Sequence, residues 1–147
     1  MSDSYIHVTQ EAGRAFMQRG LVGEITMLNL LRFRDVADYS EAPNLAPDTP
    51  ISGAAAYDRY IEHTLPFLDA AGSEVTFMGE GGAFVIGPPE ERWDLVLLVR
   101  HQSLNAFMGF ATDAAYLVGA GHRTAALADS RLLPLIETTG ALSSASD

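Results

Sequence analysis

The sequence contains no cysteine and no lysine. Without cysteine the chain can form no disulfide, thiolate zinc site or iron–sulfur cluster, and it has no thiol nucleophile. Without lysine it has no Schiff-base residue, no anchor for pyridoxal phosphate and no standard P-loop. These two absences exclude a large part of the usual catalytic repertoire.

Positive charge is also scarce, because all 9 basic residues are arginines and they are outnumbered by 19 acidic residues, for a formal net charge of −10. Nucleic acids and anionic membranes bind proteins through dense cationic surfaces, so we expect neither as a partner. Residues 1–7 lack the basic and apolar regions of a signal peptide, and no apolar run approaches the roughly 18 residues of a membrane span. We therefore expect a cytoplasmic protein.

Motifs that bind cofactors are missing as well. The chain has no His-x-His or His-x-x-x-His pattern, so a metal site would need ligands from distant segments. The glycines of residues 79–82 lack the spacing and the following helix of a dinucleotide site. No Gly-x-Ser-x-Gly motif supports a serine hydrolase. The residues predict neither a metal site nor an organic cofactor.

Apolar residues make up 48% of the 147-residue chain, which is typical of one packed domain. We expect residues 1–137 to form that domain and the small, polar residues 138–147 to be a disordered tail.

Hydrophobic patterning divides the domain into strands and helices. Residues 9–19 read as a short N-terminal helix, and residues 34–50 as a Pro-rich loop longer than the usual limit of about 12 to 15 residues. The segments 74–78 and 83–86 form either one strand with a glycine bulge or a small hairpin. The other predicted elements are the strands 24–33, 93–101 and 130–136 and the helices 53–71 and 103–111.

This order of elements is strand, helix, strand, strand, helix, strand, which is the ferredoxin-like βαββαβ unit of the α+β class. Right-handed crossovers place both long helices on one face of a four-stranded antiparallel sheet. Pro134 marks the last strand as an edge strand, because proline removes a hydrogen-bond donor from the ladder.

The central strands are apolar on both faces. In strand 24–33, Met27 and Leu31 share one face while Leu28 and Leu30 share the other, and strand 93–101 has the same character. Two helices can cover only one face, and bare apolar patches of several hundred Å² are rare on monomers. We expect a homodimer whose sheets face each other around a cavity.

Several motifs, taken together in order, resemble the family catalogued as domain of unknown function 1330. The likeness covers roughly residues 24–136 and rests on residues 27–33, Ser52-Gly53 with Tyr57 and Tyr60, Trp93-Asp94, Tyr116, His122-Arg123 and residues 126–132. The resemblance implies the dimeric α/β-barrel superfamily, whose other branches include cofactor-independent monooxygenases, dye-decolourising haem peroxidases and muconolactone isomerases. It implies a fold and a dimer, without an established activity. The Pro-rich loop 34–50 departs from the family pattern.

Two polar residues of the first strand are candidates for a site. Asn29 is an amide in an apolar strand, and it needs partners in a neighbouring loop, across the dimer or in a ligand. Arg32 lies on the opposite face, where it either pairs with Asp35 or Asp94 or binds an acidic ligand.

Further candidates lie in the second half of the chain. His122 and Arg123 follow two glycines and are either packing residues or catalytic, with His122 as acid or base and Arg123 and Asn29 holding an oxyanion. Tyr57, Tyr60 and Trp93 fit a core by spacing, yet a tyrosine hydroxyl can serve a pocket. His101 shares a face with apolar strand residues and could edge the cavity. The predicted ligand-binding set is Asn29, Arg32, Tyr57, Tyr60, Trp93 and His101.

We expect from these features that the protein binds a small hydrophobic or aromatic metabolite in a cavity. One alternative is a cofactor-independent enzyme of the monooxygenase or isomerase type. Another is a non-catalytic sensor or accessory protein that binds a partner through the loop 34–50. Haem binding would depend on His101 or His122 as the axial ligand. Whether the protein is an enzyme stays open at this point.

Overall fold

The computed structural model describes residues 4–138 and residue 140, so the predicted tail 138–147 lies almost entirely outside the described residues. Its elements follow the predicted order, with additional short helices. They are α1 (Gln10–Gln18), β1 (Ile25–Phe33), the 3-10 helix η1 (Pro43–Leu45), α2 (Gly53–Ala70), β2 (Glu74–Ala83), β3 (Arg92–His101), α3 (Leu104–Ala111), α4 (Ala114–Val118), α5 (Gly121–Ala126) and β4 (Leu127–Leu135).

The four strands form one antiparallel sheet in the order β2-β3-β1-β4. This is the strand order of the ferredoxin-like fold, so the predicted fold class is confirmed. The sheet is open, with β2 and β4 at its edges, and the prediction that the strand carrying Pro134 is an edge strand is correct. β1 and β3 occupy the centre, which explains why these two strands are the most apolar segments of the chain.

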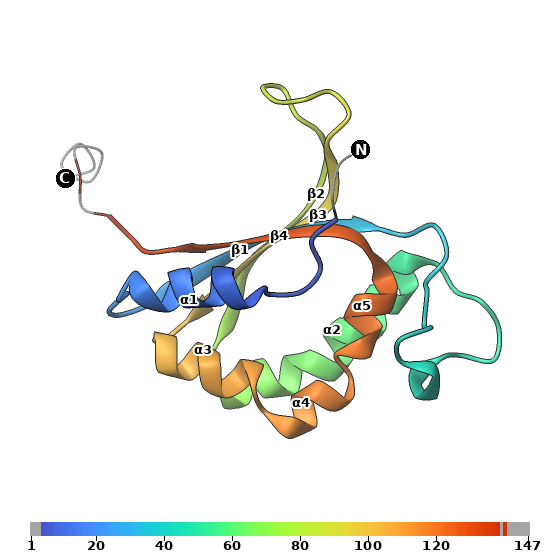
Figure 1. Ribbon diagram of the computed structural model, residues 1–147, viewed down its shortest axis with the longest axis horizontal. Helices are drawn as coiled ribbons and strands as arrows, with labels where there is room; N and C mark the ends of the chain where they lie inside the picture. The colour runs from blue at the N-terminus through green and yellow to red at the C-terminus, as the bar shows by residue number, and fades with distance from the viewer. Residues whose placement is uncertain (1–3, 139, 141–147) are drawn as a thin grey trace.

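All the helices lie on one side of the sheet (Figure 1). Serine side chains start two of them, because the Ser52 hydroxyl accepts from the N–H of Ala55 and the Ser103 hydroxyl accepts from the N–H of Ala106. The core lies between the sheet and α2, where Leu31 and Leu127 are 0% exposed and Tyr57 is 3% exposed. Residues of β1 that point to this side are therefore well placed to build a site.

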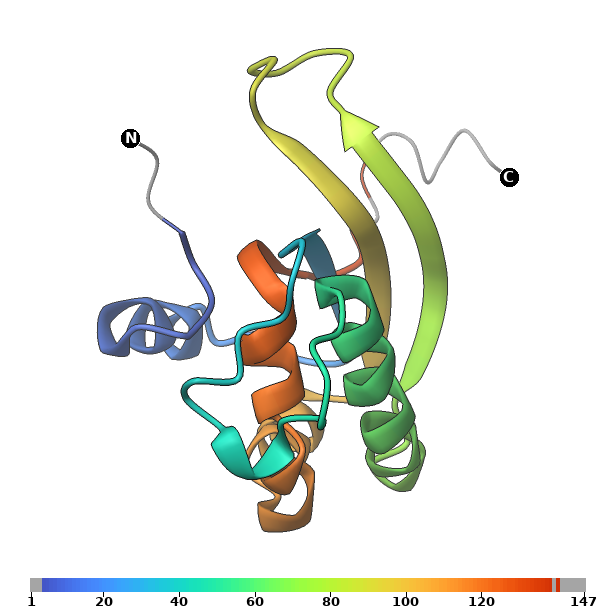
Figure 2. The same cartoon turned by 90° about the vertical axis from the view of Figure 1, so that its right-hand side faces the viewer.

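Residues 74–86 form neither the predicted strand with a glycine bulge nor the predicted small hairpin of segments 74–78 and 83–86. β2 is one strand that runs through Gly79 to Ala83, and its register shift lies between Val75 and Phe77 rather than at the glycines. Residues 84–91 form the turn of a hairpin that projects well beyond the rest of the sheet (Figure 2). The predicted strand 83–86 is therefore wrong beyond Ala83.

The last strand also begins earlier than predicted, at Leu127 instead of Ser130. The short helix α5 directly precedes this strand, and the residues after Thr112 form the separate helix α4. Asp113 starts α4, since its carboxylate accepts from the N–H groups of Ala115 and Tyr116.

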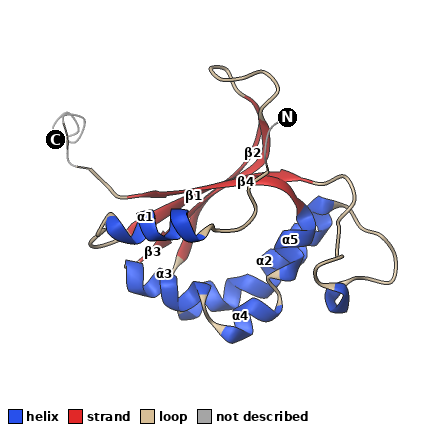
Figure 3. Cartoon of the chain, in the orientation of Figure 1, coloured by secondary structure: helices blue, strands red, loops and turns tan. Residues whose placement is uncertain are grey.

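The Pro-rich loop 34–50 packs on α5. The N–H of Arg34 donates to the Ala126 carbonyl at 2.8 Å, and the N–H of Asp38 donates to the Ala125 carbonyl at 2.9 Å. The Tyr39 hydroxyl lies 2.7 Å from Nδ1 of His122. These bonds make the loop a cover for α5 along its length (Figure 3).

The opposite face of the sheet has no helix over it in the described part of the chain. Its centre is apolar, because Leu28 lies beside Leu98 on one side and Leu133 on the other, and Leu30 lies beside Val96. At the edges of this apolar face, Leu133 is 51% exposed and Phe77 is 52% exposed. We call the surface formed by Leu28, Leu30, Phe77, Val96, Leu98 and Leu133 the bare sheet face.

Among the described residues, none of the helices combines the length and the hydrophobicity that crossing a membrane requires.

Candidate ligand-binding cavity

A cavity of about 530 Å³ lies on the helix side of the sheet. Its floor is formed by residues of β1 and β3, its walls by α2, α3 and Tyr116 of α4, and its remaining side by the N-terminal segment with α1. The lining includes Met27, Leu97, Val99, Leu68, Phe16, Phe107 and Phe110. The sequence predicts a cavity between two facing sheets, whereas this cavity lies on the other face, inside one copy of the chain.

Three tyrosines bring hydroxyl groups to this apolar space. The Tyr60 and Tyr116 hydroxyls are hydrogen-bonded at 2.7 Å, and the Tyr57 and Tyr60 rings have centroids 5.3 Å apart. Burial raises the pKa of Tyr57 and of Tyr60 well above the ordinary value, because the charged phenolate is poorly solvated there. Both phenols are neutral at pH 7. The Tyr60 hydroxyl is paired with that of Tyr116, which leaves the Tyr57 hydroxyl as the donor for the cavity.

Thr64 is a polar lining residue without a partner. Its side chain lies on α2, its residue is 3% exposed, and its hydroxyl has no hydrogen-bond partner within the described part of the chain. A buried hydroxyl in that state costs about 1 to 3 kcal/mol. The oxygen is closed off from solvent as well as from protein partners, so this cost is a property of the packing of α2.

Arg123 of α5 supplies a half-buried guanidinium to the lining. Its Nη1 donates to the Ile6 carbonyl at 2.8 Å, and its Nη2 lies 3.4 Å from the Ser130 hydroxyl. None of the ion pairs among the described residues includes Arg123. Its positive charge opposes the rise in the pKa of Tyr57 that burial causes, so the two groups share one electrostatic environment.

Backbone groups of residues 5 and 6 hold the N-terminal segment over the cavity. The N–H of Tyr5 donates to the Asp129 carboxylate at 2.8 Å, and the Ser130 hydroxyl donates to the Tyr5 carbonyl. Arg123 binds the next carbonyl, that of Ile6. We call residues 5–9 the N-terminal strap, because they connect α1 to β4 and α5 across one side of the cavity.

His101 and Asn29 are the predicted polar residues of the sheet that line the cavity. His101 is 2% exposed, its Nδ1 lies 2.7 Å from the Ser73 hydroxyl, and its ring contacts that of Phe107 at 5.0 Å between centroids. Burial, together with the neighbouring Arg100 charge, lowers the pKa of His101 from 6.5 to about 4, so the ring is neutral at pH 7. The Asn29 amide donates to the Met27 carbonyl at 3.2 Å.

Five of the residues that the sequence predicts for a site therefore line one cavity, namely Asn29, Tyr57, Tyr60, His101 and Arg123. His122 does not, because its ring faces Tyr39 of the loop 34–50. Consecutive residues of a helix point about 100° apart, and on α5 this rotation turns His122 toward Tyr39 while Arg123 faces the cavity. Burial, with the nearby Arg59 and His63, lowers the pKa of His122 below its ordinary value.

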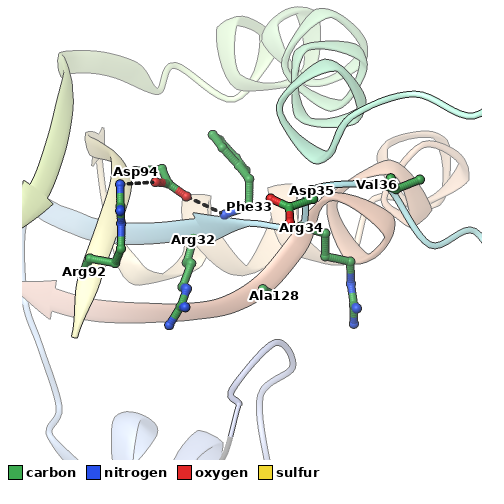
Figure 4. Close-up of a pocket in the computed structure, with 8 residues that line it drawn as sticks. All are labelled: Arg32, Phe33, Arg34, Asp35, Val36, Arg92, Asp94 and Ala128. Atoms are coloured by element: carbon green, nitrogen blue, oxygen red, sulfur yellow. Dashed lines mark hydrogen bonds and ion pairs between the residues drawn. The ribbon is translucent and has the colours of Figure 1, made fainter. Parts of the chain in front are cut away.

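Arg32 and Trp93 also lie outside the cavity lining. Arg32 borders an open, polar hollow of about 550 Å³ at the end of β1, where it points the same way as Arg34 and opposite to Phe33 (Figure 4). Asp94 pairs with Arg92 at 3.5 Å, and Arg32 forms no ion pair within the described residues, so its expected pairing with Asp35 or Asp94 is wrong. The Trp93 indole N–H donates to Glu91 at 3.1 Å.

Sequence reasoning missed the N-terminal strap, Ser130 and the role of Thr64. Thr64 fits the apolar stripe of α2 by spacing, and nothing in that pattern separates a packed threonine from an unpartnered one. Ser130 is the first residue of the predicted last strand, whereas in the structure it lies inside β4 and lines the cavity. Within the described residues, no three histidine or acidic side chains lie close enough together to hold a metal ion.

The fold and the site define a class: a ferredoxin-like α+β protein with a cavity between its sheet and its helices. No protein-family model and no curated protein matches the chain. Among solved structures, the chain is similar to RPA0582, a protein of unknown function from Rhodopseudomonas palustris, with 33% identity and a TM-score of 0.80 over 92% of this chain and 98% of that chain. A crystal structure of the methylated RPA0582 protein matches at 32% identity and a TM-score of 0.81, covering 94% of this chain and 98% of that one. The chain belongs to the family of RPA0582.

A dimeric protein of unknown function with a ferredoxin-like fold, from Bacteroides fragilis NCTC 9343, matches at 12% identity and a TM-score of 0.48, over 78% of this chain and 96% of that chain. A likeness this distant carries no inference about how the present chain assembles.

Proposed function

We propose that the protein binds a small hydrophobic or aromatic molecule in the cavity between the sheet and the helices. The observation that carries this proposal is a cavity of about 530 Å³ with aromatic walls and a few polar groups. Small-molecule sites typically measure about 300 to 1,000 Å³ and combine apolar walls with a small number of orienting polar groups.

A pair of matched variants of α2 tests the proposal. Ile61 lines the cavity, whereas Leu65, one turn further along the helix, is 47% exposed and does not line it. Binding of aromatic acids, quinols and lactones is measured by thermal shift and calorimetry for the unmodified protein, Ile61→Trp and Leu65→Trp. We expect compounds that bind the unmodified protein and Leu65→Trp and fail to bind Ile61→Trp. If no compound of a broad panel binds, or if Ile61→Trp binds as well as Leu65→Trp, the cavity is not the site.

We also propose that two copies associate through the bare sheet face, as in the dimeric α/β-barrel proteins, and that the chain belongs to the family of domain of unknown function 1330. Support for the dimer comes from the uncovered apolar side chains of β1, β3 and β4. The β2–β3 hairpin rises on the same side as this face (Figure 1). At its tip, Val85 is 102% exposed and Ile86 is 93% exposed, and a facing copy would shelter them.

Cofactor-independent catalysis of the monooxygenase or isomerase type is a second candidate, because Arg123 and Asn29 line the same cavity and could hold an oxyanion. The expected acid or base, His122, faces the loop 34–50 instead, which favours binding over turnover. Turnover of any bound compound that is unaffected by His122→Ala would exclude His122 from catalysis.

A sensor or accessory role through the loop 34–50 has less support. The loop is fastened to α5 by two backbone hydrogen bonds and by the Tyr39–His122 contact, so much of its hydrogen-bonding capacity is used within the chain.

A further inference from the structure

We propose that the molecule bound in the cavity is a hydrophobic monocarboxylate whose carboxylate pairs with Arg123. This inference rests on the proposed function of the cavity and adds the charge of its ligand. It depends on the distribution of charge around the cavity, which differs sharply from that of the whole chain.

Among residues 4–138 and residue 140, no acidic residue lines the cavity, although the full chain has 19 of them and a net charge of −10. Two arginines, Arg123 and Arg131, belong to the lining. Arg131 is compensated, because its Nη1 lies 2.7 Å from the Asp129 carboxylate. Arg123 has no such partner among the described residues, so the wall of the cavity carries one uncompensated positive charge.

The hydrogen bonds of Arg123 leave donors for a ligand. A guanidinium has five N–H groups, and the contacts of Arg123 are one bond to the Ile6 carbonyl at 2.8 Å and a long one of 3.4 Å to the Ser130 hydroxyl. Both acceptors are uncharged. A carboxylate binds a guanidinium through shorter, charge-assisted bonds, so an anion is the partner that this side chain lacks.

Neutral donors nearby fit a single negative charge. The Tyr57 phenol lies in the electrostatic field of Arg123 and is neutral at pH 7, so it can donate a hydrogen bond to an anion and cannot compete as one. His101 is neutral as well, because burial lowers its pKa to about 4, and it adds no second cation. One guanidinium with neutral donors matches a monocarboxylate better than a dianionic phosphate, and an organic cation would find no counter-charge in the lining.

The apolar part of the cavity lining determines the uncharged part of the ligand. Phe16, Phe107 and Phe110 line the cavity, and aromatic rings bind flat apolar groups through stacked and edge contacts. The inferred ligand is therefore an aromatic or otherwise hydrophobic group with one carboxylate.

The test compares acids with their uncharged amides. Calorimetry measures the binding of phenylacetate, cinnamate and 2-naphthoate, each beside its primary amide, at pH 7. We expect each acid that binds to do so roughly tenfold or more tightly than its amide, and Arg123→Gln to remove that preference while leaving amide binding within about threefold.

Two controls separate charge from the fastening of the N-terminal strap. Arg59→Gln removes an exposed arginine of α2 that does not line the cavity, and it should leave the preference for acids unchanged. Ser130→Ala keeps the Arg123 charge, loses the bond from Ser130 to the Tyr5 carbonyl of the strap and frees the Arg123 Nη2 donor, and it should also keep the preference. Loss of the preference in Ser130→Ala would assign it to the strap and overturn the role of Arg123.

The outcomes distinguish this inference from the proposed function. Acids and amides that bind equally, in a manner blocked by Ile61→Trp, would overturn the carboxylate and leave the cavity as the site. Absence of binding by both series and by the wider panel would overturn both.

Discussion

The two faces of the sheet are similarly apolar in sequence and have opposite surroundings. On the helix side, Met27 is 2% exposed and Leu31 is 0% exposed, whereas on the bare sheet face Leu133 is 51% exposed and Phe77 is 52% exposed. The helix side mixes its apolar residues with interior polar groups such as Asn29 and Thr64. On the bare sheet face Leu28 has leucines on both sides, and charge lies around them. Arg131 is the β4 neighbour of Leu30, and at the end of the strands Arg100 pairs with Glu24 at 2.8 Å and with Glu74 at 3.0 Å.

This difference indicates two tasks for one pair of strands. Polar groups inside an apolar enclosure are typical of small-molecule sites, while an apolar centre with a charged rim is typical of protein interfaces. Alternation of side chains along β1 lets adjacent residues serve the two tasks independently, since each residue points to the opposite face from its neighbour. Substitutions on one face should therefore leave the function of the other unchanged.

The largest expected effect is loss of association after Leu28→Glu. Leu28 lies between Leu98 and Leu133 on the bare sheet face, so the change would bury two like charges near each other in a dimer and weaken it by roughly 3 kcal/mol or more, about a hundredfold in Kd. Light scattering should show the unmodified protein at twice the 15.8 kDa chain mass and the variant at one chain mass. Leu65→Glu, on the outer side of α2, should remain dimeric, and a monomeric unmodified protein would contradict the assignment.

A smaller effect concerns the helix side and pH. His101 has a pKa of about 4 in the folded protein and 6.5 as the reference value, so the unfolded chain binds its proton first as the pH falls. The stabilising contribution of the neutral His101 ring is complete above about pH 6.5 and is lost as the pH falls toward 4. We therefore expect the free energy of unfolding to decrease by about 1 to 2 kcal/mol from pH 7 to pH 5. The lower part of this range allows for Ser73, whose hydroxyl can bond either form of the ring.

Denaturant unfolding at pH 7 and pH 5 measures this dependence. The variant His101→Gln has no imidazole to protonate, so the difference between the two pH values should shrink by the stated amount. An unchanged difference would mean that His101 is accessible to protons in the folded protein.

Tyr116→Phe should cost about 1 kcal/mol of stability. The change removes the 2.7 Å hydrogen bond to the Tyr60 hydroxyl, which is a buried group on the helix side. The free energy of unfolding is the measured quantity, and Tyr5→Phe, at a residue that is 52% exposed, is the matched control with no expected change. Dimerisation should be unaffected. A change in the mass measured by light scattering would show that the helix side and the bare sheet face are energetically coupled.

The smallest effect has the opposite sign. Thr64→Val replaces an unpartnered buried hydroxyl with a methyl group and should raise the free energy of unfolding by about 1 kcal/mol. Thr112→Val is the contrasting change, because the Thr112 hydroxyl donates to the Met108 carbonyl at 2.7 Å and its loss should not stabilise the protein. A destabilised Thr64→Val would indicate that the hydroxyl has a partner in solution.

Local patterning was sufficient to predict the strands, the long helix and the two faces of β1. A period of two residues assigns Met27 and Leu28 to opposite faces without any knowledge of the rest of the chain, and the structure agrees. The position of the cavity was beyond such reasoning, because the N-terminal strap is held through the backbone of Tyr5 and Ile6, and every residue carries the same backbone groups. His122 and Arg123 are adjacent in sequence, and only the rotation of α5 decides which one meets the cavity.

The mode of attachment of the N-terminal strap has an evolutionary consequence. Its fastening uses the amide and carbonyl groups of two residues, so their side chains can be exchanged without releasing the segment. Relatives with other residues at positions 5 to 8 could line one wall of the same chamber differently and admit other compounds, while the sheet, the helices and the arginine stay as they are. The ligand selectivity of the cavity can then change through substitutions at positions 5 to 8, with little effect on folding.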